Sequence, residues 1–246
     1  MRIAIAGGTG TVGRHVTAAA EGRGHEVRVL SRAAGVDLAT GAGLDLTGID
    51  AVIDVSGTTT QSESRARAFF EASTRHLLGA GRSAGVRHHV ALSIVGVDRA
   101  PFGYYAGKAA QEHAVANGPL PWTVLRATQF HEFAAQMIDQ MRYGPVVVVP
   151  KMRTRPVAAR TVSEHLVRCA EESPAGFAPE LAGPREDRMS RMVRALAAHR
   201  GIRAGVLEVP LPGRFGRALR DGGILPSDPA DAVLEGPTFA EWLRTR

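Results

Sequence analysis

Three residues near the middle of the chain have the types and the spacing that proton transfer requires. Tyr104 and Lys108 lie four residues apart, so in a helix they share one face. An ammonium group beside a phenol stabilises the phenolate and lowers the pKa of the tyrosine, which makes the phenol a better acid or base. Ser93, eleven residues before Tyr104, could hold a substrate oxygen there. The chain therefore predicts a catalytic group of Tyr104, Lys108 and Ser93, although a Tyr-x-x-x-Lys spacing alone also arises by chance.

The elements around these residues put them at a ligand-binding edge. Residues 89–95 are apolar and predict a strand that ends just beyond Ser93, while residues 104–115 have the pattern of a helix. Ligands of α/β sheets bind outside the carboxyl ends of the strands, so Ser93 and the start of that helix are expected there. The neighbouring Tyr105 is expected to be a packing residue or a pocket wall.

The first sixteen residues predict a dinucleotide-binding turn. An apolar strand over residues 2–6 runs into Gly7, Gly10 and Gly13, and a helical stripe follows at once. Glycine is needed where the backbone turns tightly, where it approaches a phosphate and where the new helix packs on the sheet. The helix start favours an anion through its free N–H groups and its dipole. The alternative is a glycine-rich turn that only reverses the chain.

The end of the second predicted strand, residues 26–30, indicates which dinucleotide binds. A carboxylate about 20 residues after the glycines would bind the adenosine ribose diol. Here Arg32 follows the strand, and the first acid is Asp37, which is expected near the adenine. Because a guanidinium pairs well with a phosphate, NADP is favoured over NAD. The alternative leaves Arg32 a surface residue.

Two further segments are expected to line the site. Ser56 follows a buried strand over residues 51–55, where small residues would let the chain pass close to the cofactor; an ordinary polar loop is the alternative. Phe130, His131 and Phe133 follow the strand over residues 122–127 and are expected to contact the substrate. His131 could act as an acid or base. It could also be a helix-start residue facing solvent, and the two phenylalanines could equally be core.

Strands and helices alternate along the first 145 residues, which predicts an α/β fold with a Rossmann-type doubly wound parallel sheet. A short third strand is expected at residues 35–38 and a helix at residues 62–83. Beyond residue 145 strands and helices become shorter, and residues 210–234 are rich in turns. We expect an NAD(P)-binding Rossmann domain over residues 1–145 and a small substrate lobe over residues 146–246, packed on the same core.

Composition restricts the class of protein. The 246 residues carry a net charge of +6, but the basic residues are spread over every predicted element, so nucleic-acid binding is not expected. No apolar run approaches the ~20 residues of a membrane span. The single cysteine, Cys169, excludes an internal disulfide, and no metal site is expected, since the adjacent His88 and His89 face opposite ways on a strand. The chain is expected to be cytoplasmic.

Four segments together resemble the atypical short-chain dehydrogenases/reductases, and within them the NmrA-like NAD(P)H-binding proteins. These segments are the Gly-x-x-Gly-x-x-Gly turn, Leu92–Asp98, Tyr104–Glu112 and Trp122–Phe130. The resemblance implies a Rossmann domain with a small carboxyl-terminal substrate lobe. It puts Ser93, Tyr104 and Lys108 at the serine, tyrosine and lysine of the superfamily. It also assigns a set of residues to the cofactor: Gly7, Gly10, Thr11, Val12, Arg32 and Lys108.

Two functions from different classes follow. The first is an NADP-dependent oxidoreductase that transfers a hydride between NADP(H) and a small carbonyl or related unsaturated substrate. The second is a non-catalytic sensor of the NADP(H) ratio that acts through a protein partner, because the family that the chain resembles contains such proteins as well as reductases and isomerases. The presence of Ser93, Tyr104 and Lys108 favours the enzyme, since a sensor has no need of all three.

Overall fold

Apolar residues on both faces of the first strand place it at the centre of the sheet. In β1 (Arg2–Ala6), Ile3 and Ile5 join one apolar core, while Ala4 and Ala6 join another on the opposite face. Burial on both faces is typical of a parallel strand. β1 pairs in parallel with β2 (Glu26–Leu30) on one side and with β3 (Ala51–Asp54) on the other. The computed structural model describes residues Met1–Arg246.

The sheet extends from β3 through four more strands to its far edge. Its order is β13-β10-β5-β4-β3-β1-β2, with β9 beside β5, and all of its strand pairs are parallel. The added strands are β4 (His88–Ile94), β5 (Trp122–Ala127), β9 (Gly176–Phe177), β10 (Leu181–Ala182) and β13 (Val233–Leu234). The predicted α/β fold with a doubly wound parallel sheet is confirmed.

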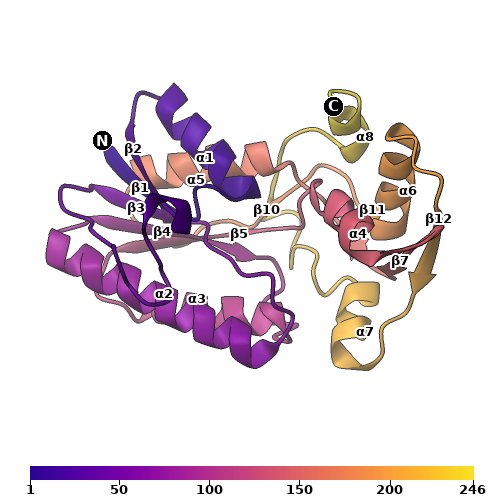
Figure 1. Ribbon diagram of the computed structural model, residues 1–246, viewed down its shortest axis with the longest axis horizontal. Helices are drawn as coiled ribbons and strands as arrows, with labels where there is room; N and C mark the ends of the chain where they lie inside the picture. The colour runs from indigo at the N-terminus through magenta and orange to yellow at the C-terminus, as the bar shows by residue number, and fades with distance from the viewer.

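Helices cover both faces of the sheet (Figure 1). α1 (Thr11–Gly22) and α5 (Ala159–Glu171) pack together on one face. α2 (Glu63–Ala84) and α3 (Tyr104–Ala116) pack together on the other. None of the helices is both long and apolar enough to cross a membrane.

A third apolar core, that of a lobe, lies beside the carboxyl edge of the sheet, on the right in Figure 1. Met189, Met192 and Leu196 of α6 pack there with Trp242. The helices of this lobe are α4 (Phe133–Met141), α6 (Met189–His199), α7 (Gly213–Asp221) and α8 (Phe239–Leu243). Its strands are β6 (Arg142–Tyr143), β7 (Val146–Pro150) and β12 (Gly205–Val209) in one sheet, and β8 (Arg153–Thr154) and β11 (Asp187–Arg188) in another.

Segments of the sheet and of the lobe alternate along the chain, whereas the sequence predicted one division at residue 145. α4 precedes that residue and belongs to the core of the lobe, while α5 and strand β10 follow it and belong to the Rossmann sheet. The strand expected at residues 35–38 is absent. A 3₁₀ turn, Arg32–Ala34, and an isolated bridge from Asp37 to Ala42 occupy this region, and Val36 and Leu38 are buried in the core on one face of the sheet. α7 lies in the segment that was expected to be rich in turns.

Gly13 shows how tightly α1 packs on the turn before it. A Cβ atom at Gly13 would lie 2.1 Å from the carbonyl oxygen of Gly7 and 2.6 Å from the Cα of Gly8. At Gly22, in the last turn of the same helix, a Cβ would meet nothing within 4 Å.

We therefore expect Gly13→Ala to lower the free energy of unfolding by roughly 3 kcal/mol, since overpacking against backbone cannot be relieved by a rotamer change. Gly22→Ala is the matched control and should leave stability unchanged or raise it by up to about 1 kcal/mol. Urea unfolding of the two variants measures the difference. Equal stability of Gly13→Ala and the wild type would show that the helix start is not packed in this way.

Candidate active site

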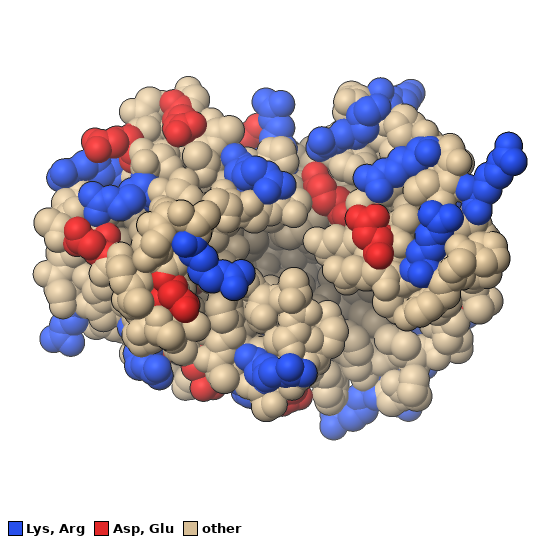
Figure 2. All heavy atoms as spheres, viewed as in Figure 1, with Lys and Arg blue, Asp and Glu red and all other residues tan.

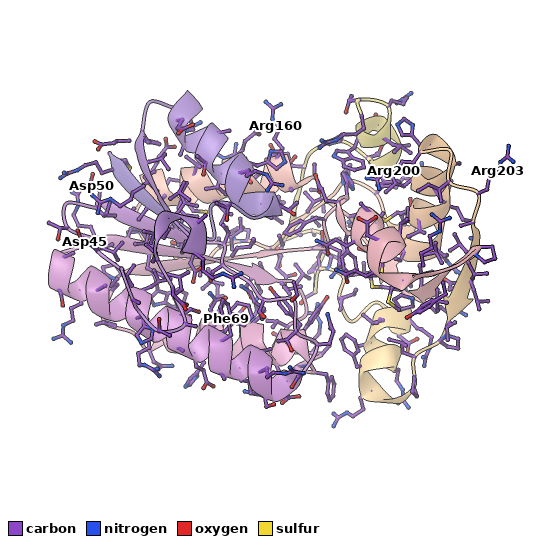
Figure 3. The ribbon with its side chains drawn as sticks, viewed as in Figure 1. Asp45, Asp50, Phe69, Arg160, Arg200 and Arg203 are labelled. Atoms are coloured by element: carbon purple, nitrogen blue, oxygen red, sulfur yellow. The ribbon has the colours of Figure 1, made fainter.

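The carboxyl ends of β1 and β3 lie side by side and open a crevice. The helices that follow these strands, α1 and α2, leave on opposite faces of the sheet, which is where α/β folds bind ligands. The strands run from the amino edge, where Asp50 is labelled in Figure 3, toward the lobe. Figure 2 shows the surface deeply hollowed between the sheet and the lobe. The predicted site therefore faces this hollow.

The glycine turn and the chain after β3 are in contact. Gly7 has φ +80°, and a Cβ on it would lie 2.8 Å from the Cα of Ser56. Ser56 is buried, its N–H donates to Asp54 Oδ1 at 2.9 Å, and its hydroxyl has no partner. Ser56 thus lies against the glycine turn, and its predicted contact with a cofactor stays a prediction.

The start of α1 is suited to an anion. Gly10 is the N-cap residue, and no side chain caps the N–H groups of the first turn, which begins with Thr11 and Val12. A Cβ on exposed Gly10 would meet only the Gly7 carbonyl oxygen, at 3.2 Å, so the space outside the turn is open. Free N–H groups at an open helix start fit a pyrophosphate. Gly13 differs from Gly10, because it faces the backbone of the turn and not the open space outside it. Its role is to let α1 pack closely on the turn.

Arg32 and Asp37 lie beyond the end of β2. Arg32 is exposed, and its guanidinium forms no hydrogen bond or ion pair. Asp37 instead uses Oδ1 to accept from the N–H of Ala39 at 2.9 Å, which closes a local turn. A free arginine at this position suits a phosphate better than a ribose diol.

Ser93 and Tyr104 come from β4 and from the first residue of α3. Ser93 is buried, and its hydroxyl has no hydrogen-bond partner. The Tyr104 ring packs edge-on against Phe70 of α2, with ring centroids 5.4 Å apart. Its hydroxyl lies 3.1 Å from the place that a Cβ on Gly57 would take, and it makes no hydrogen bond. The two hydroxyls are therefore not bonded to each other or to any other protein group.

The Lys108 side chain is buried and hydrogen-bonded. Its ammonium donates to Gln111 Oε1 and lies 4.7 Å from the centroid of the Phe70 ring. Gln111 Nε2 donates in turn to Asp54 Oδ2 at 2.8 Å. All three polar side chains are buried. Sequence reasoning missed Asp54 and Gln111; the signal available was an acid at the end of an otherwise apolar strand.

The expected effect of Lys108 on Tyr104 is wrong for the protein in this state. Burial is the main cause that raises the pKa of Tyr104, and the nearby charge of Asp54 raises it further. Burial also lowers the pKa of Lys108 to about 8, an effect partly offset by Asp54 and Glu112. The ammonium does not lower the tyrosine pKa because it is held by Gln111.

An ion pair braces α3 against β5. Arg126 Nε and Nη2 donate to the two carboxylate oxygens of Glu112 at 2.9 and 2.7 Å, and Nη1 donates to Asp98 at 3.1 Å. The hydrogen bonds to Glu112 are the main cause that raises the pKa of Arg126. Because Ser93 is paired with Arg126 in the β4–β5 register, this brace fixes α3 close to the serine.

The three residues that were expected to contact the substrate, Phe130, His131 and Phe133, lie in different surroundings. His131 is fully buried, its Nε2 bonds to the carbonyl of Pro237 at 3.0 Å, and its ring packs on Phe239 and Trp242. It is therefore not a solvent-facing residue: it anchors the carboxyl-terminal segment through Nε2, while its Nδ1 has no partner. Phe130 packs partly buried against the Rossmann core, and Phe133 against the core of the lobe.

A second polar group that the sequence did not indicate lies just beyond β5. Gln129 Nε2 donates to the hydroxyl of Tyr105 at 2.9 Å, and Gln129 Oε1 accepts from Thr154 at 2.8 Å. The Tyr105 ring also packs against Phe215 of α7, with centroids 5.7 Å apart. Tyr105 thus links α3 to the lobe. Cys169 lies apart from these groups, and burial raises the pKa of its thiol to about 11.

Comparison with known proteins bears on this arrangement. A family model described as NAD(P)H-binding matches residues 43–173, more than half of the chain and a range that holds Ser93, Tyr104 and Lys108 but not the glycine turn. No curated protein matches the sequence.

Solved structures share the fold over nearly the whole chain. The NADPH-dependent quinone oxidoreductase QOR2 of Escherichia coli, complexed with NADPH, has a TM-score of 0.74 at 18% identity and covers 99% of both chains. The UDP-glucose 4-epimerase of Thermus thermophilus with NAD has a TM-score of 0.70 at 19% identity and covers 92% of this chain and 94% of its own.

A short-chain dehydrogenase/reductase superfamily protein from Agrobacterium tumefaciens, with bound NAD, has a TM-score of 0.67 at 17% identity and covers 100% of this chain and 95% of its own. These likenesses concern the fold, and together with the family match they confirm the resemblance that the sequence motifs predicted. The chain belongs to the NAD(P)H-binding family and has the fold of the short-chain dehydrogenases/reductases.

Proposed function

We propose that the chain is an NADP-dependent oxidoreductase that transfers a hydride between NADP(H) and a small carbonyl or related unsaturated substrate. The observation that carries the proposal is the pair of hydroxyls on Ser93 and Tyr104. Neither hydroxyl makes a hydrogen bond within the protein, and both lie where the carboxyl edge of the sheet meets α3. The Ser93 hydroxyl is buried, and a buried hydroxyl without a partner is costly unless a ligand supplies one. Tyr104 is half-buried beside it, at the start of α3.

The cofactor would be held by the glycine turn and by Arg32. The free N–H groups at the start of α1 would bind the pyrophosphate, with Gly7 and Gly10 giving it room and Ser56 beside the turn. The unpaired guanidinium of Arg32 would bind the 2′-phosphate, which favours NADP over NAD. Bound NADPH would supply the hydride.

The chain's own residues would handle the substrate oxygen and its proton. Ser93 would orient the oxygen, and Tyr104 would donate the proton to it. Lys108 would bind the nicotinamide ribose, since its ammonium has three N–H donors and only one of them bonds to protein. Near Tyr104 the same ammonium would also favour the phenolate. The lobe would cover the substrate, with Phe130 and Phe133 at its junction with the sheet.

Quinones are the first substrates to test, because one structure with this fold is an NADPH-dependent quinone oxidoreductase. The alternative function is a sensor of the NADP(H) ratio that acts through a protein partner. One observation favours it: burial and Asp54 raise the pKa of Tyr104, which makes the phenol a weaker proton donor in the free protein. A panel of quinones, aldehydes and ketones with NADPH separates the two, since a sensor would bind the cofactor without consuming it.

Replacing Arg32 tests the cofactor assignment. Arg32→Ala should erase most of the preference for NADPH over NADH, because a charge-assisted hydrogen bond contributes on the order of 1.5–3 kcal/mol. Titration of both cofactors by calorimetry measures the preference. Arg200→Ala is the control, since that arginine is exposed on the lobe at the end of α6. Equal affinity of the wild-type chain for NADPH and NADH would contradict the assignment.

Replacing Tyr104 tests the chemistry. Tyr104→Phe should lower turnover by about 10²–10⁴-fold with little effect on cofactor affinity, as expected for a positioned proton donor. Lys108→Ala should lower both turnover and cofactor affinity, because the lysine is also proposed to bind the nicotinamide ribose. Tyr143→Phe is the control, because that tyrosine is exposed on β6. Full activity of Tyr104→Phe on a genuine substrate would remove the tyrosine from the mechanism and favour a proton from water.

A further inference from the structure

The carboxylate of Asp54 is buried without an ion pair. Its Oδ1 accepts from the N–H of Ser56 at 2.9 Å and its Oδ2 from Gln111 at 2.8 Å, but no basic group lies within 4.0 Å of it. A buried carboxylate is costly unless an opposite charge compensates it. The buried cation linked to it is Lys108, through the Gln111 side chain.

The amide of Gln111 can take only one orientation in this chain of contacts. An ionised carboxylate accepts hydrogen bonds and an ammonium only donates them. The NH₂ group must therefore face Asp54 and the carbonyl oxygen must face Lys108, as observed. Both hydrogen bonds are charge-assisted, which makes them stronger than bonds between neutral groups. The amide thus connects the two charges and fixes the direction of the lysine.

The other groups around the lysine do not replace this contact. On α3, Glu112 is committed to Arg126, and Tyr104 is neutral because burial raises its pKa. On β4, burial lowers the pKa of His89, and neither ring nitrogen has a partner. On α2 the nearest group is the apolar ring of Phe70. Asp54, on β3, is therefore the negative charge that is free to act on the ammonium.

We propose that Asp54 and Gln111 are positioning residues for Lys108: the buried carboxylate, acting through the amide, keeps the lysine charged and aimed at the site where the cofactor ribose would lie. The proposal rests on the proposed function for its role in catalysis. The placement and charge of the lysine can be tested without any substrate.

The composition of the chain makes that test direct, because Lys108 and Lys151 are its only lysines. Protein labelled with ¹³C at the lysine ε-carbon should give two NMR signals. The exposed Lys151 serves as an internal reference. The buried Lys108 should titrate near pH 8, since burial lowers its pKa to about that value.

Two variants should lower the titration midpoint of Lys108, and a third should raise it. Asp54→Asn and Gln111→Met remove the charge or its link, so the ammonium should lose its proton about one pH unit lower. Gln111→Glu puts a carboxylate in direct contact with the ammonium and should raise the midpoint by a similar amount. Thr74→Val is the control, because it changes a buried, unpartnered hydroxyl on α2 and should leave the midpoint unchanged.

Kinetics give a second measure that a purely structural role would not move. With a midpoint one unit lower, about one lysine in eleven is protonated at pH 8 instead of one in two. The KM for NADPH of Gln111→Met should therefore rise about fivefold at pH 8, should recover toward the wild-type value at pH 6, and should change more than kcat.

An unchanged Lys108 midpoint in Gln111→Met and Gln111→Glu would overturn the proposal, even if Asp54→Asn failed to fold. A downward shift in Gln111→Glu would overturn it as well. If the midpoints move as expected but no member of the substrate panel consumes NADPH, the proposed function fails and the positioning of the lysine stands.

Discussion

A buried negative charge at the end of β3 constrains the site. Asp54 is the last residue of β3, just before the segment that contacts the glycine turn. Because it is fully buried, its carboxylate must accept hydrogen bonds from donors inside the protein. Its Oδ1 accepts a hydrogen bond from the Ser56 N–H, and its Oδ2 accepts one from the Gln111 side-chain amide. The first contact shapes the chain beside Gly7, and the second determines where Lys108 points. One desolvated carboxylate thus links the expected cofactor turn to the expected catalytic helix.

Long-range polar contacts join the lobe to the sheet, in addition to the packing of Tyr105 on Phe215. Arg99, after β4, donates through Nε to the Gly223 carbonyl at 2.9 Å, through Nη2 to the Leu225 carbonyl at 2.6 Å and through Nη1 to Ser227. On the other side, His131 holds the segment at Pro237. The hollow between the sheet and the lobe is therefore bounded by segments tied at both ends, which suits a site that must cover a substrate.

The sequence predicted what depends on local geometry and missed what depends on distant partners. The glycine turn and the Tyr104–Lys108 spacing are local, since each element carries its own signal of spacing and turn residues. The direction of Lys108 depends on Asp54, and the burial of His131 depends on Pro237, which is 106 residues away. The pattern of residues 35–38 was that of a strand, but the segment forms only an isolated bridge. The roles of Ser93 and Arg32 remain predictions, because they require a ligand.

In the free protein Gln111 holds Lys108, and the proposed function requires the same ammonium to reach the cofactor ribose as well. A crystal structure of the chain grown with NADPH would show both contacts. We expect the pyrophosphate at the start of α1, the 2′-phosphate at Arg32, and a Lys108 Nζ that keeps its bond to Gln111 and also reaches the ribose hydroxyls. A bound cofactor whose ribose makes no contact with Lys108, or a dinucleotide bound away from the glycine turn, would be inconsistent with these assignments.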